Sequence, residues 1–456
     1  MRPGLKTKDA PAGSGLGCFA IEVLGLHLNC WKFGLLRWLK KKNTQGWVGF
    51  DIVLLGIAIG FFWYWVSGLL RMRTLFALVL VAAMCATVFG VGDDLYVNMT
   101  LLQNATAQGA VCLDGSPPAY YLHRGFDSGL SNWIVFLDGG GWCESISDCQ
   151  GRKTTDKGSS KYMMNQTNFL GILHNTTKLN PDFYNWNKVW IGYCDGSSFT
   201  GDIDEVDPGQ KLYFRGARIF KAVMDELWSQ GMQNAKNAIL SGTSAGGLAT
   251  ILNCDKFKFF FSGDVKVKCV ANAGFFINAN TISGTPNIHK KYQQVVDLHG
   301  SIKNLPPSCT SAMEPSLCFF PQNVISFIET PLFIINSAYD AWQINNTLVP
   351  SNLDPQHIWE HCKVRISDCT LSQRTTIKAF GTEFLKAFDG LTPCITRGYF
   401  ITSCHTHEQI VKPEYWLSTS SPRIINKTIA EVVGDWYFDR TGFHQYMDSY
   451  PCAKDC

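Results

Sequence analysis

The chain has 456 residues, of which 46% are hydrophobic and 17% charged, enough apolar material for a sizeable core in one large or two ordinary domains. Its net charge of +3 is unevenly distributed. Residues 1–73 carry ten Lys or Arg against three acidic residues, whereas the remainder carries 30 basic and 34 acidic residues. The mildly acidic main part lacks the basic surface that nucleic-acid binding requires, so we exclude nucleic acid as a partner.

Two uncharged apolar runs near the start, residues 52–70 and 74–92, are each long enough to span a bilayer. The second also has the features of a signal peptide: a charged start at Met72, an apolar body and a small residue, Gly92, near a cleavage point. The basic run 40–42 supports the alternative of a membrane anchor, because positive charge tends to stay on the cytoplasmic side.

These features predict the domain organisation. Residues 1–71 form an N-terminal extension with a candidate transmembrane segment at 52–70. Residues 72–92 are a signal peptide, which we favour, or a signal anchor. If Met72 is the true start, the extension is not part of the protein. Residues 93–456 then form the folded domain, whose oligomeric state the sequence leaves open.

The cysteines predict a disulfide framework. Fourteen of the 17 follow position 92, an even number, and no C-x-x-C motif pairs with a second one or with two spaced histidines, as a metal site would require. Cys143 and Cys149 could close a local loop, and the other pairings stay open. Six glycosylation sequons also agree with secretion: Asn98, Asn104, Asn165, Asn175, Asn345 and Asn426.

The first strongly predicted strand of the domain runs into glycines. Residues 133–137 are a continuous apolar run of strand length, followed by Asp138 and three glycines. In serine hydrolases a glycine-rich loop after an early strand supplies backbone amides that stabilise an oxyanion. Gly140 and Gly141 are the candidate donors, with a flexible turn as the alternative interpretation.

A second buried strand is predicted at 188–193 and is followed by the polar residues 194–199. Open α/β sheets bind ligands beyond strand ends, although polar residues there are more often turn formers. Apolar residues then recur at helical spacing over 215–230, and Gly231 ends this predicted helix. We interpret the apolar stripe as core.

Around Ser244 the sequence predicts a strand, a tight turn and a helix. Residues 237–240 are apolar, 242–246 read GTSAG, and 248–252 resemble the opening of a helix. The G-x-S-x-G pattern is that of a nucleophile elbow, with Ser244 as nucleophile and the amide of Ala245 as an oxyanion donor. The alternative is an ordinary serine in a glycine-rich turn.

The order of the later polar residues fits a catalytic triad. Asp340 follows a predicted strand at 331–336, where the hydrolase fold places its acid, and a histidine should come last. His405 and His407 are both available, and their spacing does not decide between them.

Strands alternating with helices predict a mostly parallel central sheet with helices on both faces.

Seven spaced motifs between about residue 95 and the end resemble the plant pectin acetylesterase family. In chain order they are CLDG at 112–115, LDGGGWC at 137–143, YCDGSS at 193–198, GTSAG at 242–246, NLPPSC at 304–309, CFFPQN at 318–323 and GDW at 434–436. The resemblance implies an α/β-hydrolase-like fold and removal of acetyl esters from cell-wall pectin. The same superfamily includes the animal Notum carboxylesterases, which remove a lipid from a signalling protein.

The resemblance also implies roles for individual residues. The nucleophile of the family falls on Ser244 and its acid on Asp340. Its histidine, which follows a Ser-Cys-x-x pattern, falls on His407 rather than His405. The amides of the oxyanion hole fall on Gly140, Gly141 and Ala245.

The chain departs from the plant pattern at three positions. Thr243 and Glu408 replace cysteines that usually flank the nucleophile and the histidine, and Asp138 replaces a glutamate. We hypothesise that the two cysteines pair in relatives and that this bridge is lost here. An intact thiol at either position in a relative would rule out that pairing.

The sequence therefore predicts a secreted, glycosylated serine esterase of the cell wall or apoplast that deacetylates pectin through an acyl-enzyme, without metal or cofactor. One alternative is a Notum-like deacylase of longer acyl chains. Another is an acetyl esterase acting on a different glycan such as xylan. A third is an inactive carbohydrate-binding protein, against which the intact triad argues.

Overall fold

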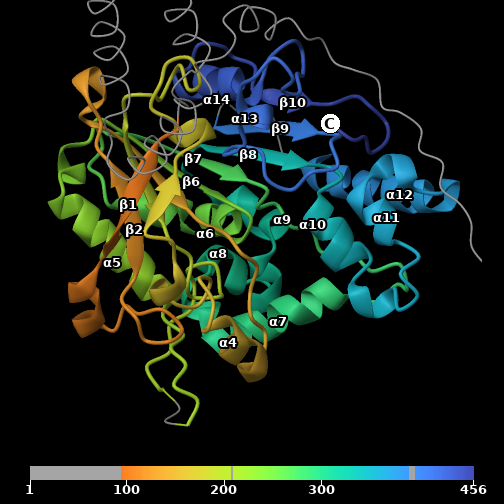
Figure 1. Cartoon of the computed structure of the whole chain (residues 1–456), viewed down its shortest axis with the longest axis horizontal. Coiled ribbons are helices and arrows are strands. Elements are labelled where there is room, and N and C mark those ends of the chain that lie inside the picture. Colours follow the sequence, from red (N-terminus) through yellow and green to blue (C-terminus); the bar gives the residue numbers. More distant parts are fainter. Residues whose placement is uncertain (1–93, 207–208, 390–395) are drawn as a thin grey trace, which may run out of the picture. The chain divides into compact units, whose positions relative to one another are not determined.

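The computed structural model describes residues 94–206, 209–389 and 396–456 (Figure 1). The apolar segments at 52–70 and 72–92 lie outside these residues, so the signal peptide, the signal anchor and the transmembrane segment stay predictions. In the described part of the chain, no helix combines the length and the apolar character needed to cross a membrane.

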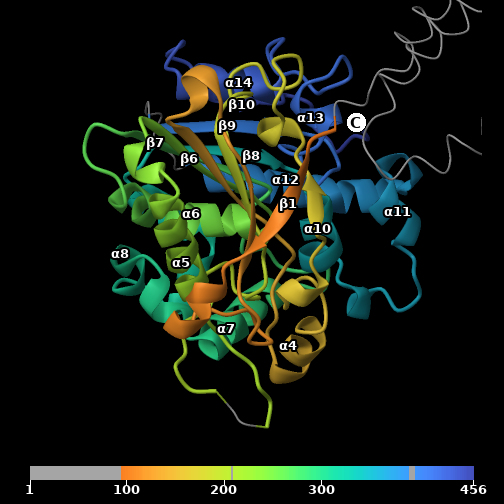
Figure 2. The same ribbon diagram turned by 60° about the vertical axis from the view of Figure 1, so that its left-hand side comes forward.

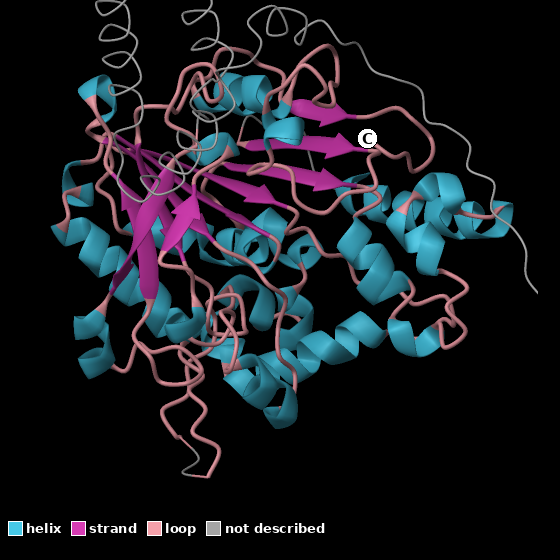
Figure 3. Cartoon of the chain, in the orientation of Figure 1, coloured by secondary structure: helices cyan, strands magenta, loops and turns pink. Residues whose placement is uncertain are grey.

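A ten-stranded sheet forms the centre of the fold, in the order β10-β9-β8-β7-β6-β3-β5-β2-β1-β4 (Figure 3). Neighbours from β10 to β5 pair in parallel, whereas β2, β1 and β4 pair antiparallel. The predicted mostly parallel sheet is confirmed. The strands are β1 (Tyr96–Leu101), β2 (Ala119–His123), β3 (Asn132–Leu137), β4 (Gln166–Asn168), β5 (Asn187–Ile191), β6 (Asn237–Thr243), β7 (Lys266–Asn272), β8 (Leu332–Ser337), β9 (Arg397–Thr402) and β10 (Gln445–Met447).

Successive residues of the central strand β3 enter two different apolar cores. Trp133, Val135 and Leu137 belong to one core, and Ile134 and Phe136 belong to the other. Side chains alternate between the two faces of a strand, so an unbroken apolar run fits a strand that is covered on both faces. This explains why β3 reads as continuously hydrophobic.

Helices from different parts of the chain complete these two cores. Helices α5 and α6 place Ile219 and Leu248 in the first core, whereas α14 places Val432 and Trp436 in the second. Figures 1 and 2 show α6 and α14 on opposite sides of the parallel strands. The helices are α4 (Ile146–Arg152), α5 (Gly216–Ser229), α6 (Ala245–Phe259), α7 (Asn287–His299), α8 (Pro307–Thr310), α9 (Pro321–Val324), α10 (Ala341–Gln343), α11 (Glu360–Val364), α12 (Leu371–Asp389), α13 (Pro413–Trp416) and α14 (Ile429–Tyr437).

The elements predicted from sequence are present with small shifts of their ends. The strands expected at 133–137, 188–193 and 331–336 correspond to β3, β5 and β8, and the helix expected at 215–230 corresponds to α5. Gly231, just beyond α5, has a φ of 110°, as expected of a glycine that ends a helix. The antiparallel strands β1, β2 and β4 were not predicted.

Six disulfides are formed among the described residues, which confirms the predicted framework and the local Cys143–Cys149 loop. Cys452 is free, and Cys394 lies outside the described residues. The other five bridges are Cys112–Cys194, Cys254–Cys269, Cys309–Cys318, Cys362–Cys369 and Cys404–Cys456.

Candidate active site

The candidate catalytic residues follow four strands of the parallel part of the sheet. The glycine loop 139–141 follows β3, Ser244 follows β6, Asp340 follows β8 and His407 follows β9. Parallel strands place their carboxyl ends at one edge of a sheet, where open α/β sheets bind ligands. The topology therefore brings together residues that are up to 268 positions apart in the sequence.

Ser244 occupies a strained turn between β6 and α6. Its φ of 57° and ψ of −125° lie in a region that residues with a side chain rarely adopt. The flanking glycines leave room for this turn: a Cβ built on Gly246 would lie 2.1 Å from the carbonyl oxygen of Leu137, and one built on Gly242 would lie 2.4 Å from the carbonyl oxygen of Gly246. The predicted elbow geometry is thus observed. A larger residue at Gly246 would force α6 away from β3, and one at Gly242 would force α6 away from β6.

Ser244, His407 and Asp340 form a continuous hydrogen-bond chain. Ser244 Oγ lies 2.8 Å from His407 Nε2, and His407 Nδ1 lies 2.8 Å from Asp340 Oδ2. Because a carboxylate only accepts, Nδ1 carries the proton, and Nε2 is then free to accept the hydroxyl proton of Ser244. The other oxygen of Asp340, which is fully buried, accepts from the backbone N–H of Gln343 at 2.9 Å.

The two candidate histidines have different environments. Burial disfavours the charged form of His407, but the charge of Asp340 and its hydrogen bond outweigh burial, so the pKa of His407 is raised above 6.5. His405 makes no contact with Ser244; its backbone N–H donates to Lys454, and burial lowers its pKa. The structure therefore brings His407, and not His405, to the serine.

The glycine loop packs directly against the elbow. A Cβ built on Gly139 would lie 2.8 Å from Ser244 Cβ, so only glycine permits this approach. Gly140 and Gly141 have φ values of 147° and 67°. Within the described part of the chain, the amides of Gly140, Gly141 and Ala245 donate to no partner. Free backbone amides beside a nucleophile are the donors that an oxyanion hole needs.

Aromatic rings line the histidine. The ring centroids of Trp342 and Phe276 each lie 6.2 Å from that of His407, with Trp342 stacked at 29°. Trp142, directly after the glycine loop, packs edge-to-face against both rings at 5.5 and 4.9 Å. This packing places an aromatic and apolar cluster beside His407.

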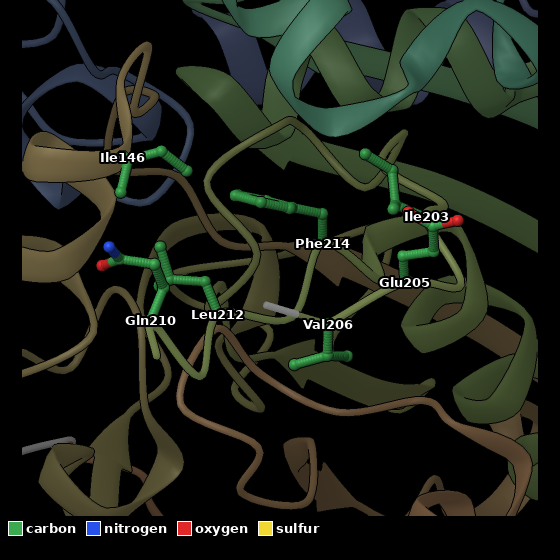
Figure 4. Close-up of a pocket in the computed structure, with 7 residues that line it drawn as sticks. All are labelled: Ile146, Ile203, Glu205, Val206, Gln210, Leu212 and Phe214. Atoms are coloured by element: carbon green, nitrogen blue, oxygen red, sulfur yellow. The ribbon is translucent and has the colours of Figure 1, made fainter. Parts of the chain in front are cut away.

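A cavity of about 520 Å³ has none of Ser244, His407 and Asp340 in its wall (Figure 4). Its lining is mainly apolar and comes from the start of α4 and from the loop before α5: Ile146, Ile203, Glu205, Val206, Gln210, Leu212 and Phe214. It borders the segment that follows the glycine loop, since Ile146 begins α4. The hydrogen-bonded residues Ser244, His407 and Asp340 therefore lie outside the lining of this cavity.

One group of metal-ligand residues occurs among the described residues, namely Cys143, Cys149 and His299. The two sulfurs are joined in a disulfide and so cannot act as thiolate ligands. His299 Nε2 lies 2.9 Å from the carbonyl oxygen of Cys143, to which it donates. We therefore assign this group a structural role behind the glycine loop.

A family model of pectinacetylesterases matches residues 92–456. The chain belongs to the pectinacetylesterase family. It is 49% identical over 361 residues to pectin acetylesterase 11 of Arabidopsis thaliana, covering 79% of this chain and 92% of that protein. Pectin acetylesterase 4 of the same plant is 42% identical over 361 residues, covering 79% of this chain and 88% of the relative.

More distant similarity extends to the Notum proteins. The chain is 27% identical over 356 residues to palmitoleoyl-protein carboxylesterase notum1a of Danio rerio, covering 73% of this chain and 65% of that protein. The solved structure of the Wnt deacylase Notum from Drosophila aligns with a TM-score of 0.66 at 23% identity, covering 79% of this chain and 98% of that one. This structural likeness confirms the predicted α/β-hydrolase-like fold.

Two departures from the plant pattern have visible contacts. Thr243 Oγ1 accepts a hydrogen bond from Asn272 at 2.8 Å, and Asp138 forms an ion pair of 2.6 Å with Lys157. Asp138 also accepts from the backbone N–H of Gly139, so the shorter carboxylate still anchors the glycine loop. The proposed loss of a bridge between positions 243 and 408 stays a hypothesis.

Sequence reasoning missed the side chains that support the site. Gln343 donates its backbone N–H to Asp340, while its side chain bonds the backbone of Phe275 and Ile277. Tyr193, predicted above as the end of a strand, and Ser198, interpreted as a turn former, contact the carbonyls of Gly141 and Ala245. Only the position of Tyr193 and Ser198 after a parallel strand could have indicated such a role.

Proposed function

We propose that this protein is a serine carboxylic ester hydrolase that removes acetyl groups from pectin, with Ser244, His407 and Asp340 as its triad. The observation that carries the proposal is the pair of 2.8 Å contacts from Ser244 through His407 to Asp340, beside a glycine loop with free amides. Family membership supports the reaction class, since pectin acetylesterases are its named members.

In the proposed reaction His407 takes the proton of Ser244 while the serine oxygen attacks the acetyl carbonyl carbon. The carbonyl oxygen becomes negative and accepts hydrogen bonds from the amides of Gly140, Gly141 and Ala245. Collapse of this intermediate breaks the ester bond, and the sugar hydroxyl leaves with the proton from His407. Water then attacks the acetyl-enzyme by the same route and releases acetate.

Two observations support a short acyl group. Relatives at 42–49% identity are named as pectin acetylesterases, whereas those named as palmitoleoyl-protein carboxylesterases are 26–27% identical. Trp142, Phe276 and Trp342 also pack against one another beside His407. Closely packed rings leave less room for a long acyl chain than for an acetyl group.

We further propose that the protein acts outside the cell, in the plant cell wall. Six disulfides fit an oxidising compartment. Asn98, Asn104, Asn165 and Asn426, four of the six sequon asparagines, are exposed and so accessible to glycosylation. A signal peptide or signal anchor at 72–92 would direct the chain there, and the anchor would also hold it at a membrane.

The test is acetate release from acetylated pectin by the secreted chain beside its Ser244→Ala variant. We expect release by the wild type and a loss of about 10⁴-fold or more in the variant, because the serine carries the acyl group. His405→Ala is the matched control and should retain activity, whereas His407→Ala should not. Equal release by wild type and Ser244→Ala would contradict the proposed mechanism.

The same proteins should be assayed on acetylated xylan and on esters of short and long acyl chains. Preference for pectin and for acetyl esters would support the proposed substrate. Ser244-dependent turnover that is faster on xylan or on long acyl esters would keep the mechanism and overturn the substrate.

A further inference from the structure

The last residue of helix α4, Arg152, places a positive charge against the glycine loop. Arg152 donates from Nη2 to the carbonyl oxygen of Gly140 at 2.8 Å and also lies 3.4 Å from that of Gly141. Its Nε donates to the carbonyl oxygen of Lys157 at 3.0 Å. The Cys143–Cys149 disulfide links the end of the loop to α4 and fixes the origin of this side chain.

Among the described residues no carboxylate contacts this guanidinium directly, although the buried Asp195 interacts with it electrostatically. In the part of the chain that the structure describes, Arg152 contacts three backbone carbonyls and the ring of Tyr193, whose centroid lies 5.3 Å away. The charge of a partly buried guanidinium is less screened than that of a fully exposed one. Two of the groups that Arg152 touches, the carbonyls of Gly140 and Gly141, belong to the loop that flanks Ser244.

The contact with Gly140 determines the direction of an amide. The carbonyl of Gly140 and the N–H of Gly141 belong to one planar peptide unit and point in opposite directions. Holding the carbonyl therefore fixes where the N–H points. Glycines at φ values of 147° and 67° have wide conformational freedom, so this loop needs such a restraint.

A second side chain holds the next peptide. The hydroxyl of Tyr193 donates to the carbonyl oxygen of Gly141 at 2.8 Å and accepts from the backbone N–H of Ser198 at 2.9 Å. Burial raises the pKa of Tyr193, so its hydroxyl keeps the proton that it donates. Ser198 in turn donates to the carbonyl oxygen of Ala245 at 2.8 Å, which connects the loop to the start of α6.

We propose that Arg152 is a positioning residue of the oxyanion hole, which orients and polarises the Gly140–Gly141 peptide while Tyr193 holds the peptide that follows. A cation bonded to a peptide carbonyl makes the N–H of the same peptide a stronger donor. The charge itself also favours the developing oxyanion. This inference rests on the proposed function, because it assigns a task in the same reaction.

The test compares Arg152→Met and Arg152→Lys with Lys153→Met, using p-nitrophenyl acetate as substrate. Lys153, the next residue, directs its amine to the carbonyl oxygen of Gln210, so its variant removes the same charge without touching the loop. We expect kcat to fall about 10–100-fold in Arg152→Met, less than the loss on deleting an oxyanion donor, with KM changed less than about twofold. Arg152→Lys should lose less, and Lys153→Met should match wild type.

Further measurements separate positioning from folding. Arg152→Ala should regain activity when guanidinium ion is added at millimolar concentration, whereas Ser244→Ala should not. Tyr193→Phe should lower kcat about 3–10-fold. A trifluoromethyl ketone inhibitor forms an oxyanion when it is bound, so its Ki should rise across the Arg152 and Tyr193 variants in proportion to their loss of kcat/KM. These readouts apply to folded protein, which an unchanged thermal unfolding midpoint identifies.

The inference is overturned if folded Arg152→Met keeps the wild-type kcat, if only KM changes, or if Lys153→Met loses as much. If Arg152→Met does not fold, two other results together overturn the inference: guanidinium ion fails to restore activity to Arg152→Ala, and Tyr193→Phe keeps the wild-type kcat. These outcomes are distinct from failure of the proposed function, which would appear as wild-type turnover that survives Ser244→Ala. In that case the inference fails as well.

Discussion

Two turns at the ends of neighbouring strands carry the proposed chemistry, and they are held in different ways. The elbow after β6 is fixed by backbone packing, since a Cβ on Gly242 or Gly246 would collide with main-chain atoms. The glycine loop after β3 has open space around Gly141 and is held by side chains, Arg152 and Tyr193. The elbow is held by exclusion of volume, whereas the glycine loop is packed in this way at Gly139 but is held by directed hydrogen bonds at Gly140 and Gly141, so the two turns should respond differently to substitution.

The largest expected effect is a loss of kcat on changing Asp340, which holds His407 beside the elbow. Asp340→Asn should lower kcat about 10⁴-fold, because an amide at this position favours the wrong tautomer of His407. The charge of Asp340 raises the pKa of His407, so its loss should also move the acid limb of the kcat/KM profile to lower pH. Asp354→Asn, which changes a buried carboxylate that contacts Ile358 and Trp359, is the control. An unmoved acid limb would argue against His407 as the base.

The packing of the elbow predicts a large cost in folding stability. Gly246→Ala should lower the free energy of unfolding by about 3 kcal/mol, because its methyl group would meet main-chain atoms of β3. Gly284→Ala provides the comparison: its φ is 79° but nothing lies within 4 Å, so it should cost only about 1 kcal/mol of backbone strain. Denaturant titration measures both, and similar losses would show that packing does not fix the elbow.

Acid should lower the free energy of unfolding through the buried His299. Burial lowers the pKa of His299 from 6.5 to about 4, so between these values the unfolded chain binds a proton that the folded one does not. Stability from this neutral histidine is present above pH 6.5 and falls by roughly 3 kcal/mol as pH drops towards 4. His299→Gln should flatten the fall in a denaturation series across this range. A slope as steep as that of wild type would assign the acid sensitivity to other groups.

The smallest expected effect on stability is at the glycine loop itself. Gly141→Ala should cost about 1 kcal/mol of folding free energy, like Gly284→Ala, because both have positive φ and open space. The kcat of this variant should nevertheless fall about 100-fold, since the strain would turn the amide of residue 141 away from the oxyanion. Thermal unfolding and steady-state kinetics on both variants check this. Unchanged kcat in Gly141→Ala would remove the loop from the proposed mechanism.

The same contrast explains what the sequence could predict. The elbow is contiguous in the chain, so strand, turn and helix around Ser244 were visible as a pattern. Asp340 was chosen because it closely follows a buried strand, and the structure places it in hydrogen-bond contact with His407. His405 and His407 could not be separated by spacing, because the choice depends on which ring reaches Ser244 in three dimensions.

The supports of the glycine loop were not predictable from the sequence. Arg152 acts 12 positions and Tyr193 52 positions away from the carbonyls that they hold, and neither belongs to a pattern with a recognisable period. The antiparallel strands β1, β2 and β4 were also missed. The residues of β4 are all polar, and β1 mixes exposed with buried ones, so neither carries the apolar run that marked the central strands.

The Cys404–Cys456 bridge can form only late in chain synthesis. Cys404 lies three residues before His407, and its partner is 52 residues further along the chain. The segment that carries the base is therefore fastened only after position 456 has been synthesised and both thiols have been oxidised. In the proposed mechanism His407 would then be held in place only late in biogenesis, once the chain has reached an oxidising compartment.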